Sequence, residues 1–152
     1  MSPQPLKRHG GLQPLSREHH QGLILALNVD KGIKKGIAVD RIVKYIIDHY
    51  EQLLKPHFEF EEKEVFTFLP KANEFRQKAE QQHEAIEQIV QGLNSINDCK
   101  NFSDLLRKHI RFEERELFEL IQKHVAPEEL DHLIGKWEEN LSCMNWDDRF
   151  WE

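Results

Sequence analysis

The sequence predicts an all-α protein, an up-down-up-down four-helix bundle with a short C-terminal helix and tail. Apolar residues recur at helical spacing along several long segments, for example at Ile42, Val43, Ile46, Ile47 and Tyr50. The chain has 7 glycines and 6 prolines, and most of them fall between these segments. Four long segments with short connections favour antiparallel neighbours in a bundle.

The helical segments follow one another between breaks made by proline, glycine and small polar residues. Residues 1–14, with three prolines and two adjacent glycines, are expected to form an extended arm, and Ser16 is the expected N-cap of the first helix. Pro56 lies inside the second helix and should kink it just before His57. A turn is expected over residues 95–101. The expected helices cover residues 16–30, 39–69, 73–93, 102–124 and 128–140.

Composition and charge argue against several classes of partner. The net charge of −6 at pH 7 disfavours nucleic acid or an anionic membrane surface as the main partner. No apolar run approaches the roughly 18 residues that a membrane helix needs, and the N-terminus lacks the apolar core of a signal peptide. Cys99 and Cys143 lie outside any CxxC pattern, so neither a disulfide framework nor a thiolate zinc site is indicated. We expect a cytoplasmic protein with one domain over residues 1–152, its bundle core at about 15–125 and its C-terminal helix and tail at 127–152.

One ten-residue motif occurs twice. HFEFEEKEVF begins at His57 and HIRFEERELF begins at His109, and six of the ten positions are identical. In each copy a histidine is followed four residues later by a glutamate, Glu61 or Glu113. Residues i and i+4 of a helix lie on one face, about 5–6 Å apart, so each pair can hold a metal ion. The two copies predict a site for two ions or one shared pair.

The spacing alone is a weak signal. It also occurs at His83/Glu87, outside the duplicated motif, and at His124/Glu128, where Pro127 should interrupt the helix. The prediction of a metal site therefore depends on the duplicated motif. Imidazole suits iron, zinc, copper and nickel, and carboxylates can bridge two ions.

Two further histidines would complete such a site. His83 shares a helix face with apolar residues and should point inward. In the first helix His19 and His20 compete, because only one of two adjacent residues can point fully inward. Leu23 and Leu27 follow His20 at +3 and +7, the phase seen after His83, so we favour His20 and keep His19 as the alternative.

With these residues in order, the chain resembles the hemerythrin-like family, also called HHE cation-binding domains. The resemblance covers about residues 15 to 125 and rests on EHH at 18–20, HFEFEEKEVF at 57–66, QHEAI at 82–86 and HIRFEERELF at 109–118. It implies a four-helix bundle around two non-haem iron ions with an oxo or hydroxo bridge. The implied metal ligands, with both glutamates bridging, are His20 or His19, His57, Glu61, His83, His109 and Glu113.

The chain departs from the family at one position. Oxygen-carrying hemerythrins have a further histidine one helical turn before the ligand of the third helix, where this chain has Ala79. O₂, NO or water can take the missing position. We expect a di-iron protein that binds O₂ or NO at an open iron position, in sensing, storage, or redox and iron handling. The alternatives are a di-iron enzyme that reduces peroxide, O₂ or NO, and a zinc-binding or metal-free helical interaction module.

Other acidic and aromatic residues have less certain roles. The remaining glutamates shared by the two motifs are Glu62, Glu64, Glu114 and Glu116. We expect most of them to form a solvated face, with hydrogen bonds to the ligand imidazoles as the alternative. Trp146, Phe150 and Trp151 should fold back over one end of the bundle, and a homodimer contact is the alternative.

Overall fold

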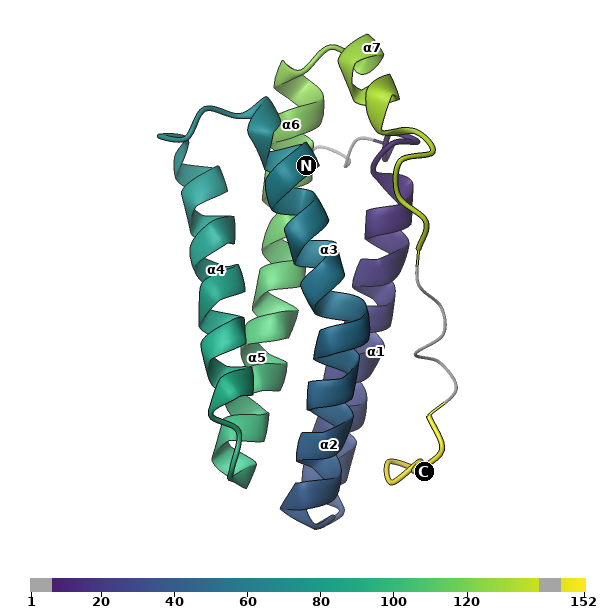
Figure 1. Cartoon of the computed structure of the whole chain (residues 1–152), viewed down its shortest axis with the longest axis vertical. Coiled ribbons are helices and arrows are strands. Elements are labelled where there is room, and N and C mark those ends of the chain that lie inside the picture. Colours follow the sequence, from purple (N-terminus) through teal and green to yellow (C-terminus); the bar gives the residue numbers. More distant parts are fainter. Residues whose placement is uncertain (1–6, 140–145) are drawn as a thin grey trace, which may run out of the picture.

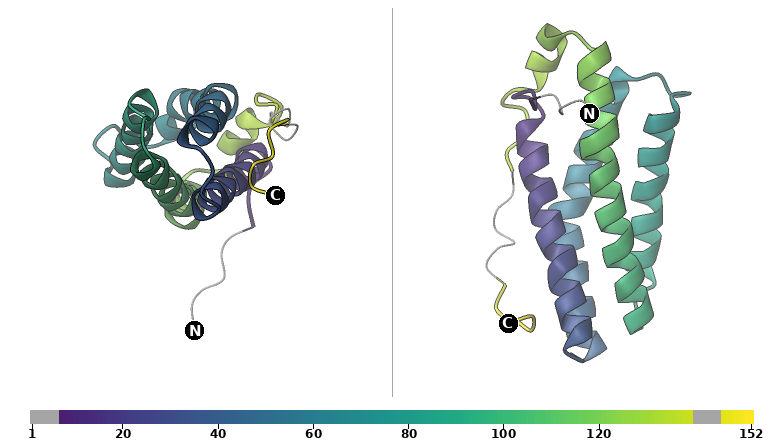
Figure 2. Two further views of the ribbon diagram at one scale, coloured as in Figure 1. Left: turned by 90° about the horizontal axis from the view of Figure 1, so that it is seen from below. Right: turned by 180° about the vertical axis from the view of Figure 1, so that it is seen from behind.

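The computed structural model describes residues 7–139 and 146–152. Long helices with short connections make up most of residues 13–133, and the described ranges contain no strand. The helices run lengthwise beside one another, and α1 packs most extensively against α5 (Figure 1; Figure 2). The prediction of an all-α fold is confirmed. None of the described helices is long and apolar enough to cross a membrane.

The first helix, α1, spans Gln13–Lys34 and is longer at both ends than expected. Pro14 lies in its first turn, where a backbone N–H has no helical partner in any case. The predicted N-cap is wrong, because Ser16 lies inside the helix and donates its hydroxyl to Glu114. The chain reverses at Gly36, whose φ of 71° favours glycine.

Each long helical stretch of the bundle is called a rod below, and the second rod contains two π-helical segments. It consists of α2 (Val39–His49), a π-helical segment (Tyr50–Leu54), α3 (Lys55–Phe60), a second π-helical segment (Glu61–Val65) and a 3₁₀ turn (Phe66–Phe68). The irregularity expected at Pro56 takes the form of the π-helical turn before it, since proline offers no N–H to the ladder there. The rod ends before Pro70, as expected.

The remaining rods begin with polar caps. They are α4 (Glu74–Gln91) and the sequence of α5 (Ile96–Phe112), a π-helical segment (Glu113–Leu117) and α6 (Phe118–His124). Asn73 caps α4 by accepting from the N–H groups of Phe75 and Arg76. The turn predicted over residues 95–101 is wrong, because Ser95 accepts from the N–H of Asp98 and starts α5 there.

The C-terminal helix is shorter than predicted. Within the part of this segment that the structure describes, only α7 (Pro127–Leu130) and a 3₁₀ turn (Asp131–Leu133) form, and Gly135, at φ 81°, takes the chain out of the helical region. The predicted end at Asn140, the first six residues of the arm and Cys143 lie outside the described residues.

The aromatic tail folds back against α1 and α2, near the connection between them (Figure 1). Phe150 is buried against Gly32, and Trp146 and Trp151 lie with their rings 5.8 and 5.0 Å from the ring of Tyr45. The predicted fold-back is therefore confirmed, but the tail packs on the side of α1 and α2 near one end and does not lie over that end (Figure 2).

Two clusters of buried apolar side chains lie along the bundle. One includes Leu25, Ile46 and Phe102, and the other includes Leu12 and Phe118. Along each rod most residues of one cluster precede the candidate metal ligands and most residues of the other follow them, while Phe58, Ile110 and Phe112 lie between a ligand histidine and its glutamate. The polar site is therefore held between two apolar layers, which limit its access to water.

Gly11, just before α1, allows close packing against the segment after α6. A Cβ atom there would lie 2.6 Å from the backbone oxygen of Leu130 and 2.8 Å from Leu133 Cβ. A Cβ at Gly10 would have its nearest neighbour, on Ile134, at 3.8 Å.

We predict that Gly11→Ala lowers the free energy of unfolding by about 1–3 kcal/mol, because backbone atoms must move to make room. Gly10→Ala is the control, since both variants share the same change in the unfolded chain. Urea unfolding followed by circular dichroism measures the difference, and equal stabilities of the two variants would contradict the predicted contact.

Candidate metal centre

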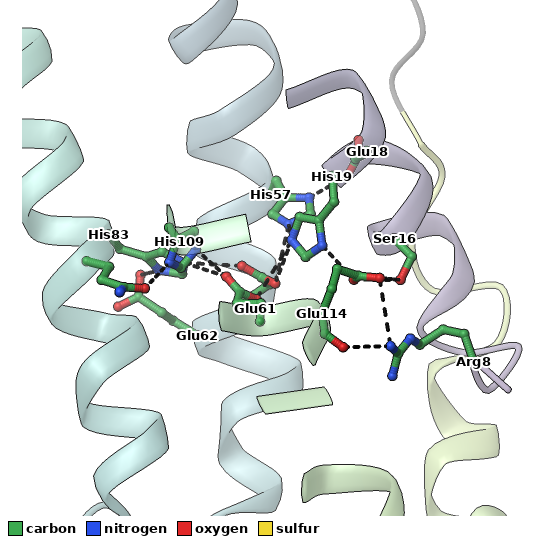
Figure 3. Close-up of polar contacts among 12 residues, drawn as sticks. Arg8, Ser16, Glu18, His19, His57, Glu61, Glu62, His83, His109 and Glu114 are labelled. Carbon is green, nitrogen blue, oxygen red and sulfur yellow. Dashed lines mark hydrogen bonds and ion pairs between the residues drawn. The ribbon is translucent and has the colours of Figure 1, made fainter. Parts of the chain in front are cut away.

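Six buried ionisable side chains from four rods converge at the middle of the bundle (Figure 3). They are His19, His57, Glu61, His83, His109 and Glu113, and each is at most 4% exposed. Their ligand atoms form two overlapping groups that could each hold a metal ion, one of Glu61, His83, His109 and Glu113 and the other of His19, His57 and Glu61. We refer to these as the His83–His109 half and the His19–His57 half.

The structure resolves the choice of the inward histidine on α1. His19 is buried in the cluster, and His20 is exposed and outside it. The preference for His20 is therefore wrong as regards orientation. The preference assumed that Leu23 and Leu27, which follow His20, lie on the buried face of α1. Leu27 is 48% exposed, so this assumption was wrong.

Glu61 divides its two oxygens between the halves. Its Oε2 lies 3.3 Å from His57 Nε2 and 3.7 Å from His19 Nε2. Its Oε1 lies 3.2 Å from His83 Nε2. A carboxylate in this position can bridge two ions.

Glu113 makes the complementary arrangement. Its Oε1 contacts Nε2 of His109 and lies 3.4 Å from His83 Nε2, and its Oε2 lies 3.8 Å from His19 Nε2. The two glutamates thus lie between the same two pairs of imidazoles.

Each imidazole is held from behind through its Nδ1 atom. His57 Nδ1 lies 2.8 Å from Glu18 Oε1, and His109 Nδ1 lies 2.6 Å from Gln82 Oε1. Such contacts make Nδ1 the donor and leave Nε2 available for a metal.

The other two imidazoles use glutamates of the duplicated motif. His19 Nδ1 lies 2.7 Å from Glu114 Oε2, and His83 Nδ1 lies 3.4 Å from Glu62 Oε2. The alternative prediction, a hydrogen bond to a ligand imidazole, is therefore confirmed for Glu114, whereas Glu62 lies near His83 Nδ1 without a hydrogen bond. Glu116 is exposed, and Glu64 pairs with Lys136 at 3.7 Å, as the solvated-face prediction expects.

Both candidate glutamate ligands start a π-helical segment, Glu61–Val65 and Glu113–Leu117. A π-helical turn holds an extra residue and frequently marks a functional site. Sequence reasoning missed these segments, although the identity of the two motifs signalled that both copies share one local conformation.

The polar environment shifts the pKa values of the cluster. Burial lowers the pKa of His19, but the hydrogen bond with Glu114, the nearby carboxylate of Glu61 and the charge of Glu113 outweigh it and raise the pKa to about 10. Burial raises the pKa of Glu61, but the charge of His57 and the close contacts with the neighbouring imidazoles hold the pKa well below the ordinary value. For His109 burial prevails and lowers the pKa.

The donor set fits metal cations. Both oxygens of Glu61, Glu113 Oε2 and His109 Nε2 are buried without a hydrogen-bond partner. Orphaned acceptors of this kind are costly in an apolar interior unless a cation compensates them. Four imidazole nitrogens and two carboxylates suit iron, zinc and related ions.

The other histidine patterns do not join the cluster. His124 and Glu128 are both exposed and lie on opposite sides of Pro127 in the chain. His49 is buried, but its Nδ1 donates to the backbone oxygen of Tyr45 within α2. Sequence reasoning also missed Glu18 and Gln82, which occupy the position directly before His19 and His83 respectively.

A helical protein with buried, convergent imidazoles and carboxylates belongs to the class of cation-binding helical domains. The chain matches the family model described as Hemerythrin HHE cation binding domain over residues 12–121, a range that includes all six clustered residues. The resemblance seen in the sequence is confirmed, and the chain belongs to this family. Comparison with curated proteins and with solved structures found no significant match.

Metal binding should release protons, because imidazole binds a metal only when its ligating nitrogen is unprotonated. With its pKa raised to about 10, His19 carries a proton at pH 7 that a metal ion must displace. We predict that the apparent affinity for Zn²⁺ rises with pH from 6 to 9, and that a pH indicator in weak buffer records proton release at pH 7.

The adjacent histidines supply matched variants for this experiment. His19→Ala should lower the number of protons released per bound ion, and His20→Ala should leave it unchanged. Equal proton release from the two variants would contradict the assignment of His19.

Proposed function

We propose that the protein is a non-haem di-iron protein, built on an up-down-up-down four-helix bundle, that binds O₂ or NO at an open iron position. The single observation that carries the proposal is the division of both carboxylates between two pairs of imidazoles. Family membership supports the binding of a cation, and the paired geometry favours two ions over one.

The ligand atoms can be counted for each half of the site. His19 and His57 in one half, and His83 and His109 in the other, each supply two Nε2 atoms, and Glu61 supplies one oxygen to each half. Glu113 joins the His83–His109 half, and its Oε2 lies 3.8 Å from His19 Nε2 in the other half. The ion of the His83–His109 half would then have four protein ligands, and the other ion three, or four with Glu113 Oε2. Exogenous groups would complete each set, an oxo or hydroxo bridge among them. Two divalent ions carry a charge of +4 against −2 from the glutamates, and a bridging anion reduces this excess.

One position next to the site carries a small side chain where a larger one could have stood. Ala79, one helical turn before His83, is fully buried and offers only a methyl group. The corresponding position before His19 holds the larger Leu15, also fully buried. This difference favours the His83–His109 half as the place where O₂ or NO binds.

The surroundings of the ligand atoms are apolar and aromatic. Phe58 stacks on His83 with ring centroids 4.0 Å apart, and Phe66 stacks on the same imidazole at 5.4 Å. These rings exclude water and restrict the site to small ligands, which is the property needed for reversible binding of a diatomic molecule. The cytoplasmic location and the homodimer remain predictions.

Metal analysis tests the first part of the proposal. After anaerobic reconstitution with Fe²⁺, we expect about two iron ions per chain, about one in His57→Ala and His109→Ala, and loss of both in Glu61→Ala and Glu113→Ala, because each glutamate serves both ions. His49→Ala is the control, since that imidazole is buried outside the cluster. Less than one iron per chain in the unmodified protein, or zinc bound in its place in cells, would refute the di-iron assignment.

Exposure to gas tests the second part. We predict that the reduced protein binds NO or O₂ in proportion to its iron content and releases it on removal of the gas, followed by visible absorption. Continuous consumption of O₂, NO or peroxide in the presence of a reductant would instead identify the enzyme that is the alternative to a binding protein. Absence of any spectral change in air and in NO would contradict both.

A further inference from the structure

The two halves of the site are related by an approximate internal symmetry. His19 stacks on Phe118 with centroids 5.5 Å apart and planes at 24°, and His83 stacks on Phe66 at 5.4 Å and 23°. Phe66 and Phe118 are the last residues of the two copies of the motif. The halves therefore share the stacking of one imidazole on the last residue of a motif, and the groups behind the imidazoles can be compared position by position.

The first such difference is a carboxylate opposite an amide. Nδ1 of His57 donates to Glu18, a carboxylate whose side chain is 1% exposed and whose Oε1 also accepts from Trp137 Nε1 at 2.7 Å. Nδ1 of His109, the equivalent imidazole, donates to the side-chain oxygen of Gln82. Gln82 is also buried, so the two partners differ in charge and hardly in burial.

The second difference lies between two equivalent glutamates. Glu114 is 2.7 Å from His19 Nδ1, and Ser16 donates to both of its oxygens at 2.8 and 3.0 Å (Figure 3). Glu62 is 3.4 Å from His83 Nδ1, and its side chain is 42% exposed, compared with 28% for Glu114. The carboxylate behind His19 is closer and better fixed than the one behind His83.

The segments flanking the bundle reinforce the same half. Arg8 donates to the backbone oxygen of Glu114 at 2.9 Å and lies 3.8 Å from its carboxylate (Figure 3). Trp137 reaches Glu18 from the region after α7. Both contacts hold a carboxylate in place behind an imidazole of the His19–His57 half.

A carboxylate behind an imidazole strengthens it as a ligand. It draws on the Nδ1 proton, places more electron density on Nε2 and adds negative charge near the metal, whereas a neutral amide only orients the ring. The His19–His57 half has two close carboxylates, and the His83–His109 half has one distant carboxylate and one amide.

From this we infer that the two metal positions are unequal and that the His19–His57 half binds its ion more tightly. The difference between the carboxylate of Glu18 and the amide of Gln82 then decides which half fills first. The inference rests on the proposed function, since it requires two bound ions. The weaker ion lies in the half next to Ala79 and is the exchangeable one. Glu18 and Gln82 touch no metal position directly and act as positioning residues through His57 and His109.

The order of filling can be measured by adding Fe²⁺ anaerobically to the full chain in competition with a chromophoric chelator. We expect two steps whose affinities differ by about 10- to 100-fold, the usual effect of a partner behind a metal-binding histidine. His57→Ala should remove the tight step and His109→Ala the weak one.

Two isosteric exchanges then test the cause. Glu18→Gln should weaken the tight step by about 10- to 100-fold and leave the weak step unchanged, because Gln keeps an acceptor oxygen for His57 and Trp137. Gln82→Glu should tighten the weak step. In the double variant Glu18→Gln/Gln82→Glu the order should reverse, so that adding His109→Ala to it removes the tight step.

The outcomes separate the two proposals. If fewer than one iron ion binds per chain, the proposed function fails and the inference fails with it. If two ions bind but the steps are equal, or if the exchanges shift both steps alike, the inference is wrong and the di-iron assignment stands. Unfolding midpoints of the metal-free variants show whether a change is merely structural, and a reversed order of filling cannot arise from a general loss of stability.

Discussion

Two carboxylates, Glu61 and Glu113, are completely buried at the centre of a helical protein, and the rest of the structure is arranged to compensate them. An isolated ionised carboxylate in an apolar interior is strongly destabilising. Here four imidazoles surround the pair, and the charge of His57 is the main reason that the pKa of Glu61 stays well below its ordinary value. Each rod of the bundle contributes at least one of the compensating groups, so the carboxylates require all of the rods in register.

A second layer of polar side chains lies behind the four imidazoles. Glu18, Gln82, Glu62 and Glu114 lie behind the imidazoles, and Ser16, Arg8 and Trp137 hold two of these four in turn. The network therefore extends from the middle of the bundle to segments near both ends of the chain. A change far from the ligands, at Arg8 or Trp137, can act on the site through it.

The sequence predicted the helical class and most of the cluster because periodicity and a duplicated motif are local signals. His57, Glu61, His83, His109 and Glu113 all lie together as their patterns suggested. The choice between His19 and His20 failed because two adjacent residues are separated by only about 100° on a helix, and the phase of α1 depends on its packing against α5. The roles of Glu18 and Gln82 could not be predicted, because they depend on contacts between helices. The π-helical turns could not be predicted, because they depend on how neighbouring side chains distort the backbone hydrogen bonds of the helix.

The paired π-helical turns also bear on how the chain tolerates change in length. A turn of this kind contains one residue beyond those needed for an α-helical turn, so it behaves as a tolerated single-residue insertion. Losing one residue from Glu61–Val65 or Glu113–Leu117 would restore an α-helical turn and leave the residues beyond it in phase, so Phe66 and Phe118 would stay stacked on His83 and His19. The side chains inside the turn would move instead, among them Glu62 and Glu114, which lie behind those two imidazoles. A deletion there would therefore spare the aromatic packing and alter what supports the imidazoles.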